Sequence, residues 1–270
     1  MTEPIILAGS PLFYAFLVII GLAIATYGTL VGLGGGIILL PVLLWLYPDV
    51  PPEALTGVSL AVILINALSG TAAYARQGRI KYRSGALFAL ATIPGTIFGV
   101  WLLKYLEIRV FSIIFGILLL AVSILLILRP QANSPAPSTP QVTEEKSGLS
   151  SRARHALGTG LSLAVGLIAG LLGIGGGIIH VPMMTYVLRF PVRISTATSQ
   201  FILIFTTLTG VLTHLALRTE PGNWLVVVFL AIGVIPGAQL GALISRRLRG
   251  TLIIRLLAIA LIMLGIRLIF

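Results

Sequence analysis

Two glycine-rich segments of nearly the same sequence interrupt long apolar stretches of the chain. The first reads Gly-Leu-Gly-Gly-Gly-Ile-Ile-Leu-Leu-Pro over residues 32–41, and the second reads Gly-Ile-Gly-Gly-Gly-Ile-Ile-His-Val-Pro over residues 173–182. Consecutive glycines adopt backbone angles closed to other residues and let a ligand approach closely. A helix that starts after them presents free N–H groups and the positive end of its dipole, which attract a negative group. We therefore predict an anion site at Gly34, Gly35, Gly36, Gly175, Gly176 and Gly177.

These glycines also have a structural interpretation, because small residues are common where transmembrane helices pack closely. The binding-site interpretation is favoured over the packing interpretation because the segment occurs twice. Each copy lies at a helix break and is followed by a proline five residues after its third glycine. The segments are not phosphate-binding P-loops, since no Lys-Ser or Lys-Thr follows them.

Polar side chains in the apolar stretches that follow are candidate ligands for the same anion. Hydroxyls and amides are neutral donors suited to sulfonate or carboxylate oxygens. In the alternative interpretation, each such side chain bonds its own helix backbone or a neighbouring helix. The candidates are Ser59, Asn66, Thr198, Ser199 and Gln200.

His180 and His214 are candidates for a proton relay, because imidazole titrates near neutral pH. A hydrogen-bonded packing role is the alternative for both. All seven acidic residues lie in termini, linker or short loops, and no His-Glu-x-x-His motif is present. We expect no enzymatic activity, no metal site and no cofactor.

The composition is that of a membrane protein. Hydrophobic residues make up 57% of the chain, charged residues 9%, and the mean hydropathy is +1.09. A membrane helix needs about 20 apolar residues. Two apolar pieces, 36–47 and 177–188, are too short to cross alone. Eight stretches are expected to span the bilayer: 11–30, 55–75, 85–103, 110–128, 156–172, 195–217, 224–244 and 251–270.

The chain is an internal duplication with an offset of about 140 residues. Ser59 matches Ser199, and Asn66 matches Thr206. We predict an all-α polytopic membrane protein with two inverted repeats, each of about four spanning helices plus a short re-entrant or broken helix after the glycine segment. The first repeat covers residues 1–128, a flexible linker covers 129–154, and the second repeat covers 155–270.

The basic residues predict how the chain lies in the membrane. If the piece after each glycine segment turns back toward the side it came from, fourteen of the eighteen lysines and arginines fall on the linker's side. That distribution agrees with the positive-inside rule, whereas four crossings per half give no bias. We therefore expect a cytoplasmic linker and both termini outside.

The net charge of +11 is explained by these loop residues and by contacts with lipid head groups, so nucleic acid is not an expected partner. The expected partners are a small anionic substrate and membrane lipids. The sequence leaves a homodimer open.

The order and doubling of these motifs resemble the TauE/SafE sulfite exporter family of membrane permeases. The resemblance rests on the paired glycine segments, on Thr56-Gly57-Val58-Ser59 and Ala197-Thr198-Ser199-Gln200, and on the repeated Pro94-Gly95 and Pro236-Gly237. It implies transport of sulfur-containing anions such as sulfite, sulfoacetate, other organosulfonates or thiosulfate, often outward and coupled to protons. It also implies a bacterial inner-membrane location.

We therefore expect a secondary transporter of small sulfur-containing or organic anions that works by alternating access. A passive channel for anions or small solutes is the alternative. Transport above electrochemical equilibrium would distinguish the first from the second.

Overall fold

Long apolar stretches form helices in a bilayer because a helix satisfies its own backbone hydrogen bonds. The computed structural model describes residues 11–47, 49–128, 151–218 and 224–247, and six residues between 258 and 266. All the regular structure in these ranges is helical. The elements are α1 (Pro11–Val31), α2 (Gly36–Leu46), α3 (Pro52–Arg76), α4 (Tyr82–Leu103), α5 (Ile108–Leu128), α6 (Ser151–Leu172), α7 (Gly177–Pro182), the π-helical turn η2 (Met183–Val187), α8 (Val192–Ala216) and α9 (Trp224–Ile244).

Five helices in the described ranges are long and apolar enough to cross a membrane: α1, α3, α4, α8 and α9. Helices α5 and α6 contain the predicted stretches 110–128 and 156–172. The predicted span 251–270 lies mostly outside the described residues, as do residues 129–150 of the predicted linker. The all-α membrane architecture is confirmed.

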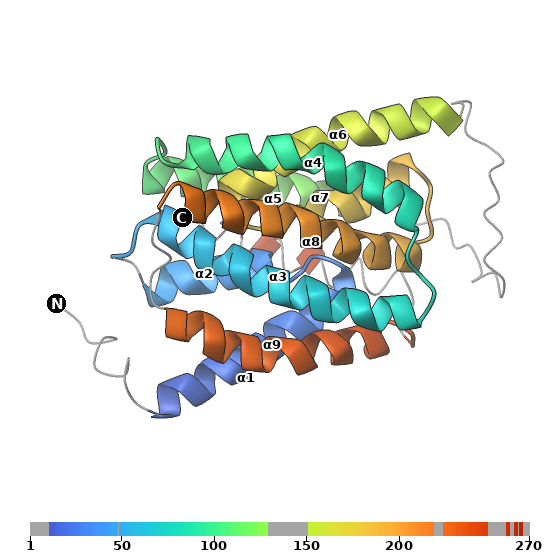
Figure 1. The fold of residues 1–270 in the computed structure, drawn as a ribbon. Helices are drawn as coiled ribbons and strands as arrows, with labels where there is room; N and C mark the ends of the chain where they lie inside the picture. The colour runs from blue at the N-terminus through green and yellow to red at the C-terminus, as the bar shows by residue number, and fades with distance from the viewer. Residues whose placement is uncertain are drawn as a thin grey trace.

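Helices α3 and α8 form the centre of the bundle (Figure 1). They pack against each other, and each also packs on a helix from the other half, α3 on α9 and α8 on α4. The most extensive pairings are α1 with α9 and α4 with α6. In each of these pairings, one helix comes before the linker in the chain and the other comes after it.

Glycines allow the outer pairs to approach closely. A Cβ atom on Gly233 of α9 would collide with the carbonyl oxygen of Val18 in α1, and one on Gly95 of α4 would collide with that of Leu163 in α6. Backbones in such contact gain van der Waals packing that larger side chains would prevent. The glycines at these positions therefore have a packing role.

The outward faces of the helices are apolar. Leu12, Ile19, Leu90, Phe98 and Val228 are exposed. Exposed apolar surface of this extent belongs in contact with lipid rather than water.

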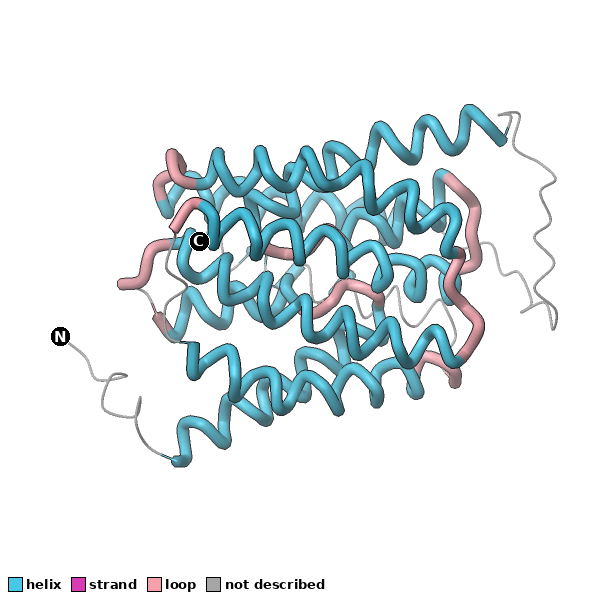
Figure 2. The backbone as a smooth tube through the Cα atoms, in the orientation of Figure 1, coloured by secondary structure: helices cyan, strands magenta, loops and turns pink. Residues whose placement is uncertain are grey.

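Each glycine segment reverses the chain inside the bundle. Figure 2 shows two short loop segments among the helices, and residues 32–36 and 173–177 are all buried. Helix α1 begins at the end of the bundle opposite to the start of α6 (Figure 1). Irregular backbone at this depth is tolerated because protein surrounds it.

Candidate functional site

The two glycine segments, residues 32–36 and 173–177, are called the breaks, and they have the same backbone conformation. Gly32, Gly34 and Gly35 have φ values of +85°, +75° and +84°, and the matching Gly173, Gly175 and Gly176 have +62°, +76° and +85°. A Cβ atom makes this left-handed region costly for other residues. The glycines are therefore required by the reversal itself, which ends α1 and α6 and starts α2 and α7.

The two breaks touch each other. A Cβ atom on Gly177 would lie 2.7 Å from the carbonyl oxygen of Gly32 and 2.8 Å from the Cα of Leu33. On the other side, a Cβ atom on Gly36 would lie 3.1 Å from the Cα of Ile174. The starts of α2 and α7 therefore come together in the interior.

A serine from each half holds the break of the other half. The hydroxyl of Ser59 in α3 donates to the carbonyl oxygen of Gly173 at 2.8 Å, and that of Ser199 in α8 donates to the carbonyl oxygen of Gly32 at 2.9 Å. All four residues are buried. In this conformation both predicted ligand hydroxyls are used to satisfy carbonyl groups that the breaks expose.

Apolar side chains cover the middle glycine of each break. A Cβ atom on Gly34 would lie 2.8 Å from Ile63 Cγ2 and 2.9 Å from a methyl of Leu203, and Gly175 faces the same two side chains. Both side chains are fully buried. The first hydrogen bonds of α2 run from the amides of Ile38 and Leu39 to the carbonyl of Gly35. The amides of Gly36 and Ile37 come before these bonds in the chain. The helix starts thus lie beside an apolar surface.

A polar cluster lies next to this apolar surface, where α1, α3 and α8 meet. Thr29 Oγ1 donates to Asn66 Oδ1 at 2.9 Å, and the Tyr74 hydroxyl donates to the Thr29 carbonyl at 2.8 Å. A Cβ atom on Gly70 would lie 3.4 Å from both Thr29 Oγ1 and Gln200 Oε1. The side chains of Thr29, Asn66, Tyr74 and Gln200 are buried. We call Thr29, Asn66, Gly70, Tyr74 and Gln200 the amide cluster.

Among the residues that the structure describes, three polar atoms of the amide cluster have no hydrogen-bond partner: Asn66 Nδ2, Gln200 Nε2 and Gln200 Oε1. Buried polar groups in folded proteins are nearly always paired, so such a group calls for an explanation. The structure therefore brings Asn66 and Gln200 together in a site with unused hydrogen-bonding capacity.

The remaining candidates lie elsewhere. Thr198 Oγ1 accepts from the backbone amide of Lys81 at 3.1 Å, near the end of the bundle. His180 is buried within its own break, with Nδ1 3.1 Å from the Gly176 carbonyl and Nε2 3.3 Å from Ser162 Oγ.

His214 lies where α8 meets α3, and a Cβ atom on Gly57 would lie 3.6 Å from its ring. Its match in the first half is Tyr74. The two histidines are therefore far from equivalent: His180 supports a break, whereas His214 lies at a contact between the halves.

Sequence reasoning missed Thr29 and Tyr74. Thr29 lies in an apolar helix three residues before its break, and nothing in the spacing along α1 relates it to Asn66. The duplication could have identified Tyr74, because it aligns Tyr74 with His214, a candidate for the proton relay.

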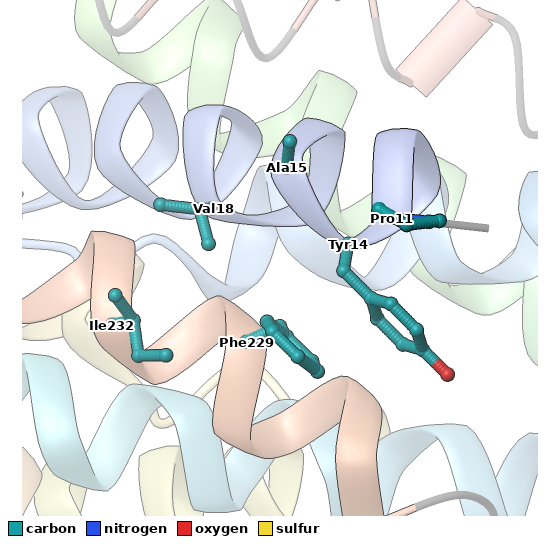
Figure 3. A pocket seen from close by; sticks show the side chains of 6 residues that line it. All are labelled: Pro11, Tyr14, Ala15, Val18, Phe229 and Ile232. Atoms are coloured by element: carbon teal, nitrogen blue, oxygen red, sulfur yellow. The ribbon is translucent and has the colours of Figure 1, made fainter. Parts of the chain in front are cut away.

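A cavity of about 430 Å³ lies between α1 and α9 and is apolar (Figure 3). Tyr14 and Phe229 stack along it with ring centroids 4.2 Å apart. It opens beside the first turns of α1, about 20–30 Å along that helix from the break. We assign it to the lipid-facing surface rather than to the site. Its lining residues are Pro11, Tyr14, Ala15, Val18, Phe229 and Ile232.

Comparisons with known proteins agree with a transporter. Residues 17–268 match the family described as "Sulfite exporter TauE/SafE". The chain is 34% identical over 268 residues to the "Probable membrane transporter protein YunE" of Bacillus subtilis, covering 95% of this chain and 97% of that protein. It is 28% identical to a "Probable membrane transporter protein" of Xylella fastidiosa strain Temecula1, covering 81% and 80%, and 23% identical to "Probable membrane transporter protein MJ0441" of Methanocaldococcus jannaschii, covering 88% of each.

No solved structure matches the chain significantly. Neither the family description nor the names of these relatives indicates a catalytic activity. The family match extends over both halves and includes both breaks, the serines that hold them and the amide cluster. The chain belongs to the sulfite exporter TauE/SafE family of membrane transporter proteins.

Proposed function

We propose that this protein is a secondary transporter that exports small sulfur-containing or organic anions, such as sulfite, sulfoacetate, other organosulfonates or thiosulfate, by alternating access. The observation that carries the proposal is the meeting of two glycine breaks in the interior, each held by a serine of the other half. Broken helices that meet at the interface of two repeats are the usual binding region of secondary transporters.

Reciprocal contacts support two inverted repeats. If a two-fold operation relates the halves, it exchanges α1 with α6 and α4 with α9, so the pairing of α1 with α9 requires a pairing of α4 with α6. Both pairings are present and are the most extensive in the bundle. The starts of α1 and α6 at opposite ends of the bundle support an axis in the membrane plane (Figure 1). Rocking of one half against the other would then open the site to each side in turn.

Clustering of basic residues supports the orientation. Arg79, in the connection between α3 and α4, is close enough to Arg193 and Arg246 for their charges to act on it. Burial, together with the charge of these two arginines, lowers the pKa of the Arg79 guanidinium. Basic residues of both halves thus gather at one end of the bundle. By the positive-inside rule this end faces the cytoplasm, with the linker. The family resemblance implies that the membrane is the inner one.

Reconstitution tests the function. Purified protein in liposomes preloaded with unlabelled anion should accumulate radiolabelled sulfite or sulfonate, and a proton gradient should raise the accumulation above electrochemical equilibrium. Protein-free liposomes are the control. Flux that only dissipates gradients would replace the transporter with a passive channel. Absence of flux for every sulfur-containing anion would overturn the proposed substrate class.

A further inference from the structure

The amide cluster offers more hydrogen-bonding capacity than the protein itself uses. Asn66 Nδ2 can donate two bonds, Gln200 Nε2 can donate two more, and Gln200 Oε1 can accept. None of these atoms has a partner in the described part of the chain. Both side chains are almost completely buried, with 1% of Asn66 and 0% of Gln200 exposed. An amide left this way is unfavourable unless a ligand or water completes it.

The orientation of the Asn66 amide is set by its neighbours. Thr29 Oγ1 donates to Asn66 Oδ1, so the oxygen is occupied and the NH₂ group remains to be used. Thr29 is itself held, because its carbonyl accepts from the Tyr74 hydroxyl. A pre-arranged donor of this kind costs a ligand little to engage.

Gly70 lets Thr29 and Gln200 approach the backbone of α3 closely. A Cβ atom there would lie 3.1 Å from Thr29 Cγ2 and 3.4 Å from Gln200 Oε1, which is tight against the first and in contact with the second. Gly70 is helical with no positive φ, so its backbone does not require glycine. The missing side chain therefore serves the close approach of Thr29 and Gln200 to α3 beside Asn66.

The positions that match Asn66 and Gln200 in the other half carry no amide. Thr206, which matches Asn66, bonds Thr92 Oγ1 at 3.0 Å. Gly210, which matches Gly70, faces the apolar Leu60, and Leu60 is the match of Gln200. Among the described residues, the amide atoms without a partner thus lie at Asn66 and Gln200, whereas the matching Thr206 and Leu60 carry no amide.

We propose that the transported anion binds off the pseudo-two-fold axis, between Asn66 and Gln200, as a singly charged oxyanion that carries a hydroxyl group. This inference rests on the proposed function and narrows its substrate class. The amide N–H groups of both residues donate to the anionic oxygens, and Gln200 Oε1 accepts from the hydroxyl group of the ligand.

Charge supports the restriction to monoanions. The side chains that hydrogen-bond within the amide cluster are neutral, and one cationic group, the Arg79 guanidinium, is close enough for its charge to act on the Tyr74 hydroxyl. Since the cost of moving an ion out of water scales with the square of its charge, a dianion costs about four times as much to bury as a monoanion of equal size. Neutral amides and a single guanidinium do not offset that difference, so the site selects hydrogensulfite and hydroxysulfonates over sulfate.

The test uses two probes that differ by one hydroxyl. Hydroxymethanesulfonate and methanesulfonate are both monoanions, and sulfate is the dianion. We expect the Tm of the full-length protein in detergent to rise most with hydroxymethanesulfonate, less with methanesulfonate and least with sulfate. The Kd for hydroxymethanesulfonate should be at least about 10-fold tighter than that for methanesulfonate, which is the discrimination expected from one buried hydrogen bond.

Two variants copy the matching residues of the other half. Gln200→Leu introduces the residue found at position 60, and Asn66→Thr introduces the one found at 206. Each should keep the Tm of the unliganded protein near that of the wild type and raise the Kd for hydroxymethanesulfonate by at least about 10-fold. Gln200→Leu should also abolish the preference for the hydroxylated probe. Gln239→Leu is the matched control, because its amide donates to Ser69 outside the cluster.

The outcomes separate the inference from the proposed function. Wild-type transport with unchanged Kd values in both variants would overturn the inference alone and leave water as the occupant of the cluster. Equal affinity for the two sulfonates would overturn the hydroxyl requirement. Absence of both ligand stabilisation and transport in the wild type would overturn the inference together with the proposed function.

Discussion

Ser199 in α8 donates a 2.9 Å hydrogen bond to the carbonyl oxygen of Gly32, which lies 167 positions earlier in the chain. Ser59 repeats the arrangement with Gly173 at 2.8 Å. A helix break exposes carbonyl groups that lipid cannot satisfy, and the two halves solve this by exchanging hydroxyl donors. Each half is therefore incomplete without the other, which makes their interface the structural centre of the protein.

Removal of one of these hydroxyls should destabilise the protein. We expect Ser59→Ala and Ser199→Ala each to lower the free energy of unfolding by about 1–2 kcal/mol, since each leaves a buried carbonyl without its partner. Thermal unfolding in detergent, followed by tryptophan fluorescence, measures the effect. Thr213→Val is the control, because the hydrogen bond that the structure describes for Thr213 Oγ1 goes to the Thr209 carbonyl of its own helix, and its Tm should stay close to wild type. Equal Tm values for all three variants would contradict the exchange of donors.

Substitution of a break glycine should be costly whatever the ligand. In Gly175→Ala, the φ of +76° costs about 1–2 kcal/mol, and the new Cβ would lie 2.6 Å from a methyl of Leu203. We expect a lower Tm and weaker transport.

Gly160→Ala is the matched control for that variant. Its Cβ would meet nothing within 4 Å, and an alanine is favourable in a helix by about 0.5–1 kcal/mol. It should leave both the Tm and transport unimpaired. A Gly175→Ala protein as stable as the control would show that the left-handed conformation is not needed.

The two histidines should respond differently to substitution. His180→Leu introduces the residue of the matching position 40 and removes the bonds to Gly176 and Ser162, so we expect a modest loss of stability with coupling preserved. His214→Tyr introduces the residue of the matching position 74, which does not titrate near neutral pH. Because His214 lies where the halves meet, we expect this variant to lose the stimulation by a proton gradient.

Initial rates of liposome uptake between pH 6 and pH 8, with and without a proton gradient, measure this coupling. A loss of coupling in His180→Leu with normal coupling in His214→Tyr would reverse the assignment. Normal coupling in both would exclude the two residues as the relay.

The orientation can be read chemically, because the chain has no cysteine. Lys104 and Arg76 are both exposed basic residues, at the end of α4 and the end of α3. We expect Lys104→Cys to react with a membrane-impermeant maleimide in intact cells, and Arg76→Cys to react only after permeabilisation. The cysteine-free protein is the control for background labelling. The opposite pattern would place the end of the bundle with Arg79, Arg193 and Arg246 outside. That result would contradict the positive-inside assignment.

The sequence by itself determined the local features of this protein. Hydropathy placed it in the membrane, and the doubled Gly-x-Gly-Gly-Gly located both breaks, because few other residues tolerate three left-handed positions in five. The order of these motifs also identified the family, which the match over residues 17–268 confirmed. These features depend on residues close together in the chain, where spacing and backbone conformation are directly linked.

Only the tertiary structure decided which side chains meet. The serines were candidate ligands in the sequence, but in the fold they hold the opposite break, and Ile63 with Leu203 covers the glycines. Asn66, Gln200 and the unforeseen Thr29 come together from three helices. The rotation and depth of each helix against its neighbours set these contacts, and hydrophobic patterning constrains rotation only loosely where a helix is apolar on every face.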